Sequence, residues 1–531
     1  MEISKSHSAP ASRRSIWLER GLVLTLLLGC ALVMADNRPP AGLWHHVFTG
    51  VDLWSNGLAE AANPDYGSQL LLAQLAIRGE STALLVFKCL LGTAVLALMI
   101  SRSYRRAISL AATALVVLPV AITLAPFWQV APAILGCVLF FALCWLLDRA
   151  FEDWTDCGSV RWSYLWCLPV VFALWANLHA SFLPALAFLA VALVSRGGEA
   201  LLRWRRHAAR SVGSLAALLA LTATATLLNP YGWHMPPAAA QIVWLELAAP
   251  STFAGSLAPT LWAFTALLLL GVVSYTRTQR RCDATQWLLL TLTAAGALLL
   301  PELIACFALA AGLWLPAHVD STLARIWGKR TTTADHDHPQ GQSLPAGVVG
   351  ARRRLTLPAK CAAAVVILMV TGVLGASLVV RLSMMPVAKT DYPLDAMQFV
   401  VARGVENRLA ISARWAPYAA AVLGPARVTP LAVDPDVSAP GVSLIVLEDS
   451  RNAAHRQRLD ADDAWVLLYD DNITSVYGQV EVYRDRDHRR YLPVRTMAGL
   501  LPMPAVVDWP ALPLVVETSL AAERSNLSHQ P

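Results

Sequence analysis

Long apolar segments recur along this chain, and they constrain its fold more than any other feature. A helix needs roughly 20 predominantly apolar residues to cross a bilayer. We identify eleven such segments, near residues 17–35, 82–100, 107–125, 130–148, 163–177, 180–195, 212–229, 260–276, 285–300, 302–317 and 361–381. Hydrophobic residues make up 56% of the chain and charged residues only 15%, unlike the balance of a soluble globular protein. The sequence therefore predicts a mainly α, polytopic helical membrane protein with about 11 transmembrane helices.

The first apolar segment is interpreted as a membrane span. MADNRPP, which follows its apolar core, lacks a clear small-x-small cleavage site. The residues ALVMA leave a cleaved signal peptide as the alternative.

The basic residues predict the orientation of the spans. Arg and Lys precede the first segment and follow the second, sixth, eighth and tenth, whereas loop 230–259 has neither. By the positive-inside rule, the N-terminus is then cytoplasmic and the C-terminal part periplasmic, as in a multi-pass protein of a bacterial inner membrane. Because the basic residues are spread over several loops, the net charge of +6 does not indicate binding of nucleic acid.

The sequence predicts five parts. Residues 1–327 form a multi-span membrane domain with a long outer loop, 36–80, and residues 361–381 form the last span. Between them, 328–360 is a cytoplasmic linker with too few large apolar residues to build a core, and its HDH triplet could bind a metal only weakly. Residues 382–510 form a separate domain, and 511–531 form a tail.

Helical and strand patterns alternate in residues 382–510, which predicts a small extracytoplasmic α/β domain. YPLDAMQFVVARG and APYAAAVLG have helical patterns, whereas RLAIS, SLIVLED, WVLLYDD, ITSVYG and VEVYRD have the patterns of strands. The nine cysteines all fall in predicted spans or cytoplasmic loops. They predict buried structural thiols, without a disulfide framework or a CxxC metal pair.

Two stretches place polar residues at the outer ends of the spans. Asn177 and His179 lie between the fifth and sixth segments, and Asn229, Tyr231 and His234 follow the seventh. These residues either cap helix ends and form an interfacial turn, or line a site, since polar groups in membrane proteins usually face the bundle or a water-filled cavity. The next segment, PPAAAQIVWLELAAPSTF, could lie on the membrane surface or partly re-enter the membrane.

The outer loop is the third polar stretch. Trp44, Phe48 and Val51 recur at helical spacing, which predicts an amphipathic helix resting on the membrane interface. The loop also carries His45, His46, Asp52 and Asp65, and such side chains could ligate a divalent cation. The two adjacent histidines point to different helix faces, so we do not expect both to bind one metal. Convergence of three stretches on one face predicts a site there.

These stretches resemble a group of bacterial polytopic membrane proteins that look like GT-C glycosyltransferases. The pattern Asp-Leu-Trp-Trp-His-Leu-x-Thr-Gly of that group corresponds to GLWHHVFTG at 42–50, and Trp-x-Asn-x-His-Gly-Gly-Phe corresponds to WANLHASF at 175–182. LLNPYG is intact at 227–232, and ISARWAPYAAAVL and WVLLYDDNITSVYG resemble segments of the C-terminal domain of the group. The resemblance implies a GT-C-like fold that acts on a lipid-phosphate-linked sugar at the outer membrane face.

The resemblance also implies roles for individual residues. Asp65, with Asp52 as its substitute, would be the catalytic carboxylate, and His179 or His234 would orient the phosphate leaving group. Asn177, Asn229, Tyr231, Trp44 and His45 complete the expected substrate-binding set. The chain departs from the pattern at Gly42, which replaces an Asp, at Ala180 and Ser181, which replace glycines, and at two arginines that APFWQV and LLLPELIACF lack.

Two functions remain open at this stage. One is an integral-membrane glycosyltransferase that moves a sugar from a polyprenyl-phosphate donor to an envelope glycan, lipid or protein. The alternative is a non-catalytic GT-C-like subunit, in contact with membrane lipids and envelope-assembly proteins, that scaffolds polysaccharide assembly or export. An ion-coupled transporter is disfavoured, because Lys88 is the one internal charge that stands out in the spans and no inverted repeat is evident.

Overall fold

The structure is a computed structural model that describes residues 13–58, 61–203, 208–248, 258–332, 356–403, 408–431, 442–449, 452–471, 473–484 and 502–514. The chain forms two compact units. Unit 1 comprises residues 1–36, 87–129 and 133–381, and unit 2 comprises 37–86, 130–132 and 382–531. The outer loop therefore folds with the C-terminal domain, which the sequence did not predict.

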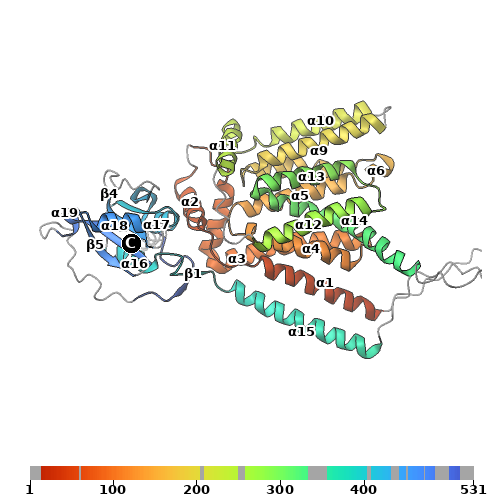
Figure 1. Cartoon of the computed structure of the whole chain (residues 1–531). Coiled ribbons are helices and arrows are strands. Elements are labelled where there is room, and N and C mark those ends of the chain that lie inside the picture. Colours follow the sequence, from red (N-terminus) through yellow and green to blue (C-terminus); the bar gives the residue numbers. More distant parts are fainter. Residues whose placement is uncertain are drawn as a thin grey trace, which may run out of the picture. The chain divides into compact units, whose positions relative to one another are not determined.

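Unit 1 is a bundle of apolar helices (Figure 1). The helices of this unit are α1 (Arg13–Met34), α4 (Leu110–Leu124), α5 (Ala133–Ala150), α6 (Trp154–Cys157), α7 (Trp162–Leu165), α8 (Leu168–Ala176), α9 (Phe182–Arg203), α10 (Ala208–Ala225), α11 (Met235–Ala248), α12 (Ala258–Arg277), α13 (Ala284–Leu299), α14 (Ile304–Thr332) and α15 (Leu357–Leu382, with its last residue in unit 2), with 3-10 turns η1 (Ala125–Phe127), η2 (Gly232–His234) and η3 (Pro301–Leu303). α3 (Tyr66–Arg105) begins in unit 2 and ends in unit 1.

Eight helices in the described part of the chain are long and apolar enough to cross a membrane. They coincide with the predicted segments near 17–35, 82–100, 107–125, 130–148, 180–195, 260–276, 302–317 and 361–381. Shorter apolar helices at Trp162–Ala176, Arg210–Ala225 and Ala284–Leu299 occupy the other three predicted ranges. The mainly helical class is thus confirmed, and these eight helices suit a membrane-embedded protein. The count of eleven spans stays a prediction.

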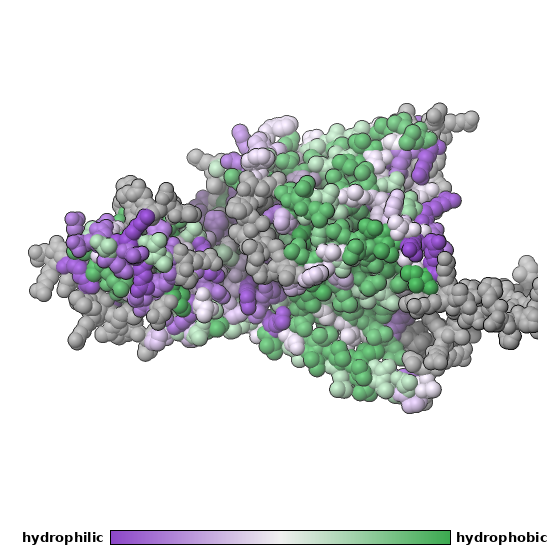
Figure 2. All heavy atoms as spheres, in the orientation of Figure 1, coloured by the Kyte–Doolittle hydropathy of each residue, from purple (hydrophilic) through white to green (hydrophobic). Residues whose placement is uncertain are grey.

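α14 forms the centre of the bundle and packs on α4, α5, α12 and α13. In the apolar 18-residue window of the Pro301–Ile326 segment, 83% of the residues are buried, whereas no residue of the corresponding window of α15 is buried. α15 instead contacts α1, where Thr25 and Thr371 share a 2.7 Å hydrogen bond. Figure 2 shows the visible face of the helical bundle as mostly hydrophobic, with hydrophilic residues gathered at one end. A surface of this kind suits contact with lipid.

Unit 2 is built on a five-stranded sheet of order β3-β2-β4-β6-β5. β2 (Arg408–Ser412) pairs in parallel with β3 (Val428–Leu431) and β4 (Val442–Glu448), while β6 (Thr474–Gln479) is antiparallel to β4 and β5 (Trp465–Asp470). A second sheet pairs β1 (Pro386–Ala388) with β7 (Val506–Asp508). The other elements are α2 (Leu43–Asn56), α16 (Leu394–Ala402), α17 (Ala416–Leu423), η4 (Pro425–Arg427), α18 (Ala453–Asp460) and α19 (Val480–Tyr483). The predicted α/β character is confirmed.

One element and two boundaries differ from the prediction. VEVYRD forms the single helical turn α19 in place of a strand, because Tyr483 folds back over Gly478, which has no side chain to block the ring. The linker predicted to begin at 328 is helical through Thr332, and the tail predicted to begin at 511 contributes Leu514 to the core. The HDH triplet lies outside the described residues. Among the cysteines, Cys30 and Cys144 are buried as predicted, whereas Cys167, Cys282 and Cys361 are exposed.

Candidate functional site

Asn177 joins two helix ends of unit 1. It is the C-cap of α8, and its amide Nδ2 donates to the carbonyl oxygens of Ala173 at 2.6 Å and of Leu228 at 2.9 Å. The first bond caps α8 itself, and the second ties α8 to the turn that follows α10. Carbonyl groups at a helix end need such a donor, because they have no partner within the helix. The side chain therefore has a structural role whatever else it does.

His179 lies in the same turn and is held by its neighbours. Its Nδ1 accepts from the backbone N–H of Ser181 at 3.0 Å and lies 2.9 Å from the Ser181 hydroxyl. That hydroxyl also accepts from Trp175 Nε1 at 3.0 Å. Because Nδ1 is an acceptor, the neutral ring carries its proton on Nε2, the nitrogen that could donate to a phosphate oxygen.

Gly136 on α5 lets this turn approach the bundle closely. A Cβ at Gly136 would stand 2.6 Å from the Ser181 hydroxyl and 3.3 Å from His179 Nδ1. Gly136 and Ser181 were not predicted from the sequence as parts of the site. The only sign of Gly136 in the sequence is that a glycine interrupts an apolar span.

The turn after α10 is organised by its own residues. Asn229 Nδ2 donates to the carbonyl of Thr226 at 2.8 Å, and its Oδ1 accepts from the N–H of Tyr231 at 2.9 Å. Gly232 has φ +51°, a conformation that glycine adopts without steric cost. Tyr231 is half-buried and His234 is exposed. Asn229 thus shapes an Asx turn, and the bond from Asn177 to Leu228 connects this turn to His179.

Trp44 lies in the core of unit 2. Its ring centroid is 4.7 Å from Tyr392, 5.2 Å from Tyr418 and 6.3 Å from Trp509, and its Nε1 donates to the carbonyl of Pro510 at 3.1 Å. The indole is fully buried. The prediction that this helix rests on the membrane interface is therefore wrong. The apolar face of α2 packs on the C-terminal domain, because Trp44, Val47 and Val51 belong to its core.

Burial also governs the ionisation of this aromatic cluster. Desolvation raises the pKa of Tyr392 to about 12 and raises the pKa of Tyr418 well above its ordinary value of 10. Both phenols therefore stay neutral across the physiological range, and the cluster acts as a core.

The other outer-loop residues lie on or near the surface of unit 2. His45 is exposed, and its ring lies 5.8 Å from that of His46. Asp52 is exposed and accepts from Asn56 Nδ2 at 2.8 Å on the same helix. Asp65 directly precedes α3, and its carbonyl accepts from the N–H of Gln69 at 2.9 Å, so it takes the helix-capping position that Asp favours.

The structure thus brings together two of the three predicted polar stretches. Asn177, His179 and the turn containing Asn229, Tyr231 and His234 meet at one end of unit 1. Trp44, His45, Asp52 and Asp65 belong to unit 2. Among the described residues, no group of three or more His, Cys, Asp or Glu side chains is arranged to hold a metal ion.

A buried network of ion pairs lies at the basic ends of the helices and was not predicted from the sequence. Arg102 on α3 donates from Nε and Nη2 to both carboxylate oxygens of Asp148 on α5, at 2.7 and 2.6 Å, and from Nη1 to the carbonyl of Leu313 on α14. Arg106 adds a 3.3 Å contact to Asp148. Charged residues at the edges of the apolar segments are the sequence feature that could have indicated these ion pairs.

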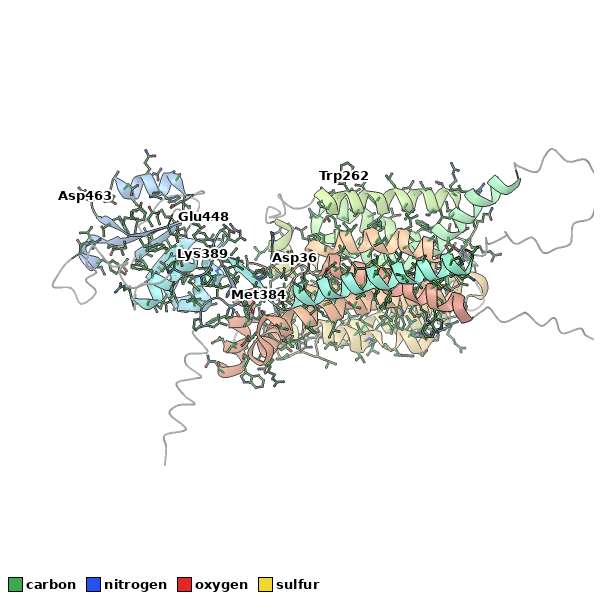
Figure 3. All side chains as sticks on the ribbon, turned by 90° about the horizontal axis from the view of Figure 1, so that it is seen from below. Asp36, Trp262, Met384, Lys389, Glu448 and Asp463 are labelled. Carbon is green, nitrogen blue, oxygen red and sulfur yellow. The ribbon has the colours of Figure 1, made fainter. Side chains whose placement is uncertain are left out.

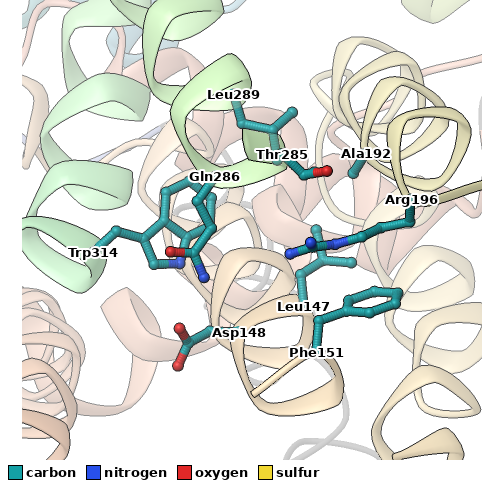
Figure 4. A pocket seen from close by; sticks show the side chains of 9 residues that line it. All are labelled: Leu147, Asp148, Phe151, Ala192, Arg196, Thr285, Gln286, Leu289 and Trp314. Carbon is teal, nitrogen blue, oxygen red and sulfur yellow. The ribbon is translucent and has the colours of Figure 1, made fainter. Parts of the chain in front are cut away.

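A second group of charges lies beside a small cavity (Figure 4). Arg196 on α9 pairs with Asp283 at 2.6 Å and Glu199 at 3.0 Å, and its guanidinium lies 4.8 Å from the centroid of the Phe151 ring. The cavity that Arg196 lines has a volume of about 10 Å³. That is the room of roughly one water molecule, far below the several hundred Å³ of a ligand pocket. Ion pairs hold these helix ends together, and the cavity beside Arg196 is too small for a substrate.

No family model, curated protein or solved structure matches this chain.

Proposed function

We propose that this protein is an integral-membrane, GT-C-like glycosyltransferase. It transfers a sugar from a polyprenyl-phosphate donor to an envelope glycan, lipid or protein at the outer face of a bacterial inner membrane. The observation that carries the proposal is the polar junction of Asn177, His179 and Asn229 at the end of unit 1, where the ring of His179 is held by Ser181. A fixed imidazole at the end of a membrane bundle suits recognition of a lipid phosphate.

The proposed reaction uses few protein groups. The acceptor hydroxyl forms a bond to the anomeric carbon, and the bond from that carbon to the phosphate oxygen breaks. Polyprenyl phosphate leaves with the electron pair, and His179 Nε2–H donates to its oxygen. A carboxylate base takes the hydroxyl proton, and the family resemblance gives that role to Asp65 or, in its place, Asp52.

A specific observation favours the non-catalytic alternative. The amide groups of Asn177 and Asn229 are hydrogen-bonded to backbone groups. Asp65 occupies the capping position of α3, and Asp52 is exposed and accepts from Asn56. The contacts of Asn177, Asn229 and Asp52 explain these side chains without chemistry, and Asp65 begins α3 through its backbone carbonyl. In that form, the protein is a membrane subunit that positions the machinery of envelope polysaccharide assembly or export.

Complementation separates the two functions. A deletion strain is supplied with the wild type, Asp65→Asn, Asp52→Asn, His179→Ala and Glu80→Gln, and envelope glycans are compared at matched protein levels. Glu80 is an exposed carboxylate within α3, the helix that Asp65 directly precedes, so Glu80→Gln is the matched control. In parallel, the purified chain in nanodiscs receives undecaprenyl-phosphate-linked glucose, galactose or mannose, and release of undecaprenyl phosphate is measured.

Transfer is supported if one carboxylate variant or His179→Ala loses a sugar while Glu80→Gln retains it. Full complementation by every variant, with a glycan defect in the deletion alone, assigns the non-catalytic role. An unaltered envelope in the deletion strain contradicts both.

A further inference from the structure

α11 has an exposed apolar face that no element in the described part of unit 1 covers. Pro237, Ala240, Gln241, Trp244 and Leu245 are exposed and follow the spacing of one helix face, while Met235 and Ala239 on the other face are fully buried. Trp244 is 71% exposed, and Trp233, just before the helix, is 76% exposed. Apart from Gln241, this α11 face is apolar, so contact with water would be costly.

The length and direction of α11 exclude a span. Its 14 residues extend roughly 21 Å at 1.5 Å per residue, less than the roughly 30 Å of a hydrocarbon core. In Figure 1, α11 runs crosswise to α9 and α10 beside their ends. The helix packs on α9 and η2.

The charges around α11 select its partner. Between Arg210 and Arg277 the chain has no Lys or Arg, and Glu246 is its single carboxylate. An acidic protein or an anionic lipid surface would call for basic residues here. Exposed indoles without basic neighbours instead suit the boundary between lipid headgroups and acyl chains, where Trp is enriched.

The neighbouring span carries the same signal. Trp262 lies near the start of α12, at the end opposite Arg277, and is 77% exposed. Figure 3 shows its ring projecting outward from the helix bundle. An exposed tryptophan therefore occurs both on α11 and on α12, a helix that is long enough to cross the membrane.

We propose that α11 lies flat in the membrane interface, with the α11 face in the acyl region of one leaflet and its buried face on α9. This places the junction of Asn177 with Leu228, which leads directly into α11, at the level of the lipid phosphates. The placement does not depend on sugar transfer, but it supplies the depth at which a lipid-phosphate donor would meet His179.

Depth-dependent quenching tests the proposal on the full chain in nanodiscs of phosphatidylcholine. The natural cysteines are replaced, and bimane is attached at Ala240→Cys or Trp244→Cys. Leu269→Cys, exposed in the middle of α12, is the deep control, and Asp463→Cys in unit 2 is the aqueous control. Quenchers are lipids with a nitroxide near the headgroup or deep in the acyl chain, and iodide in the buffer.

The proposal predicts stronger quenching by the shallow nitroxide than by the deep one at both α11 positions, with similar ratios, and the reverse order at Leu269→Cys. Quenching that deepens steadily from one α11 position to the other shows a re-entrant helix and overturns the flat placement. Iodide quenching equal to that at Asp463→Cys, or protection from all three quenchers, overturns it in favour of water or of a protein partner. Absence of transferase activity in the wild-type chain, with the quenching ratios as predicted, contradicts only the proposed function.

Discussion

Trp44 joins the first outer loop to the C-terminal domain within unit 2. The sequence placed this residue in a substrate-binding set because an aromatic residue in a loop motif next to two histidines resembles a recognition element. The structure encloses it among Tyr392, Tyr418 and Trp509. A motif can therefore persist because one large side chain completes a core, and the residue type alone does not separate the two roles.

Replacement of Trp44 by Ala tests this role. We expect Trp44→Ala to lower the free energy of unfolding of unit 2 by about 3 to 5 kcal/mol, since it leaves a cavity and removes three aromatic contacts. Trp54→Ala is the control, because Trp54 is 65% exposed, and its effect should stay within about 0.5 kcal/mol. Hydrogen exchange of unit 2 peptides in the full-length chain measures both. Equal protection in the two variants would show that Trp44 is not part of the core.

Gly50 fixes the approach of two elements, α2 and α3. A Cβ at Gly50 would stand 2.1 Å from the carbonyl oxygen of Gln69 and 2.8 Å from the Cβ of Ala73. Gly50→Ala should therefore force the helices apart and destabilise unit 2 by about 1 to 3 kcal/mol or more. Gly213→Ala in α10 meets no atom within 4 Å and should be neutral or stabilising by up to about 1 kcal/mol. Thermal unfolding by tryptophan fluorescence compares them, and matching melting temperatures would contradict the close approach.

The ion pair of Arg102 and Asp148 joins α3 to α5 at a buried site. Asp148→Asn should cost about 3 to 5 kcal/mol, because the Arg102 charge stays buried without its carboxylate. Arg102→Met combined with Asp148→Leu should recover most of that loss, since neither charge then remains. Asp153→Asn breaks the more exposed pair with Arg161 and should cost about 1 kcal/mol or less. Detergent-based melting of the purified protein measures all three, and a double variant no better than the single one would refute the account.

The buried tyrosines predict how unit 2 responds to alkali. The pKa of Tyr392 is raised from 10 in the unfolded chain to about 12 in the fold. Above pH 10 the unfolded state therefore releases protons that the folded state retains, and stability falls as pH rises toward 12. Tyrosinate absorbance should appear together with loss of unit 2 secondary structure in this window. Tyr392→Phe should lessen the loss, and ionisation near pH 10 without unfolding would contradict the burial.

At the scale of the whole molecule, the sequence predicted the elements that depend on local pattern. The apolar segments match helices, and RLAIS and APYAAAVLG match β2 and α17 at their boundaries. The partnership of the outer loop with the C-terminal domain was missed, because it joins Trp44 to residues more than 300 positions away. The strand predicted for VEVYRD was wrong, because a contact of Tyr483 with Gly478 outweighs the strand-like pattern. Long-range contacts of this kind leave no periodic signal.

The orientation of the chain in the membrane is a whole-molecule prediction that one thiol can test. Cys282 follows Arg280 and Arg281 and is exposed after α12, at the end where the positive-inside rule predicts the cytoplasm. In a chain whose other cysteines are replaced, a membrane-impermeant maleimide should label Cys282 only after the cells are permeabilised. Asp463→Cys in a Cys282→Ser background should be labelled in intact spheroplasts, because unit 2 is then periplasmic. Labelling of Cys282 in intact spheroplasts would invert the topology and move the junction of Asn177 and His179 to the cytoplasmic leaflet, where the proposed donor site would have to be reconsidered.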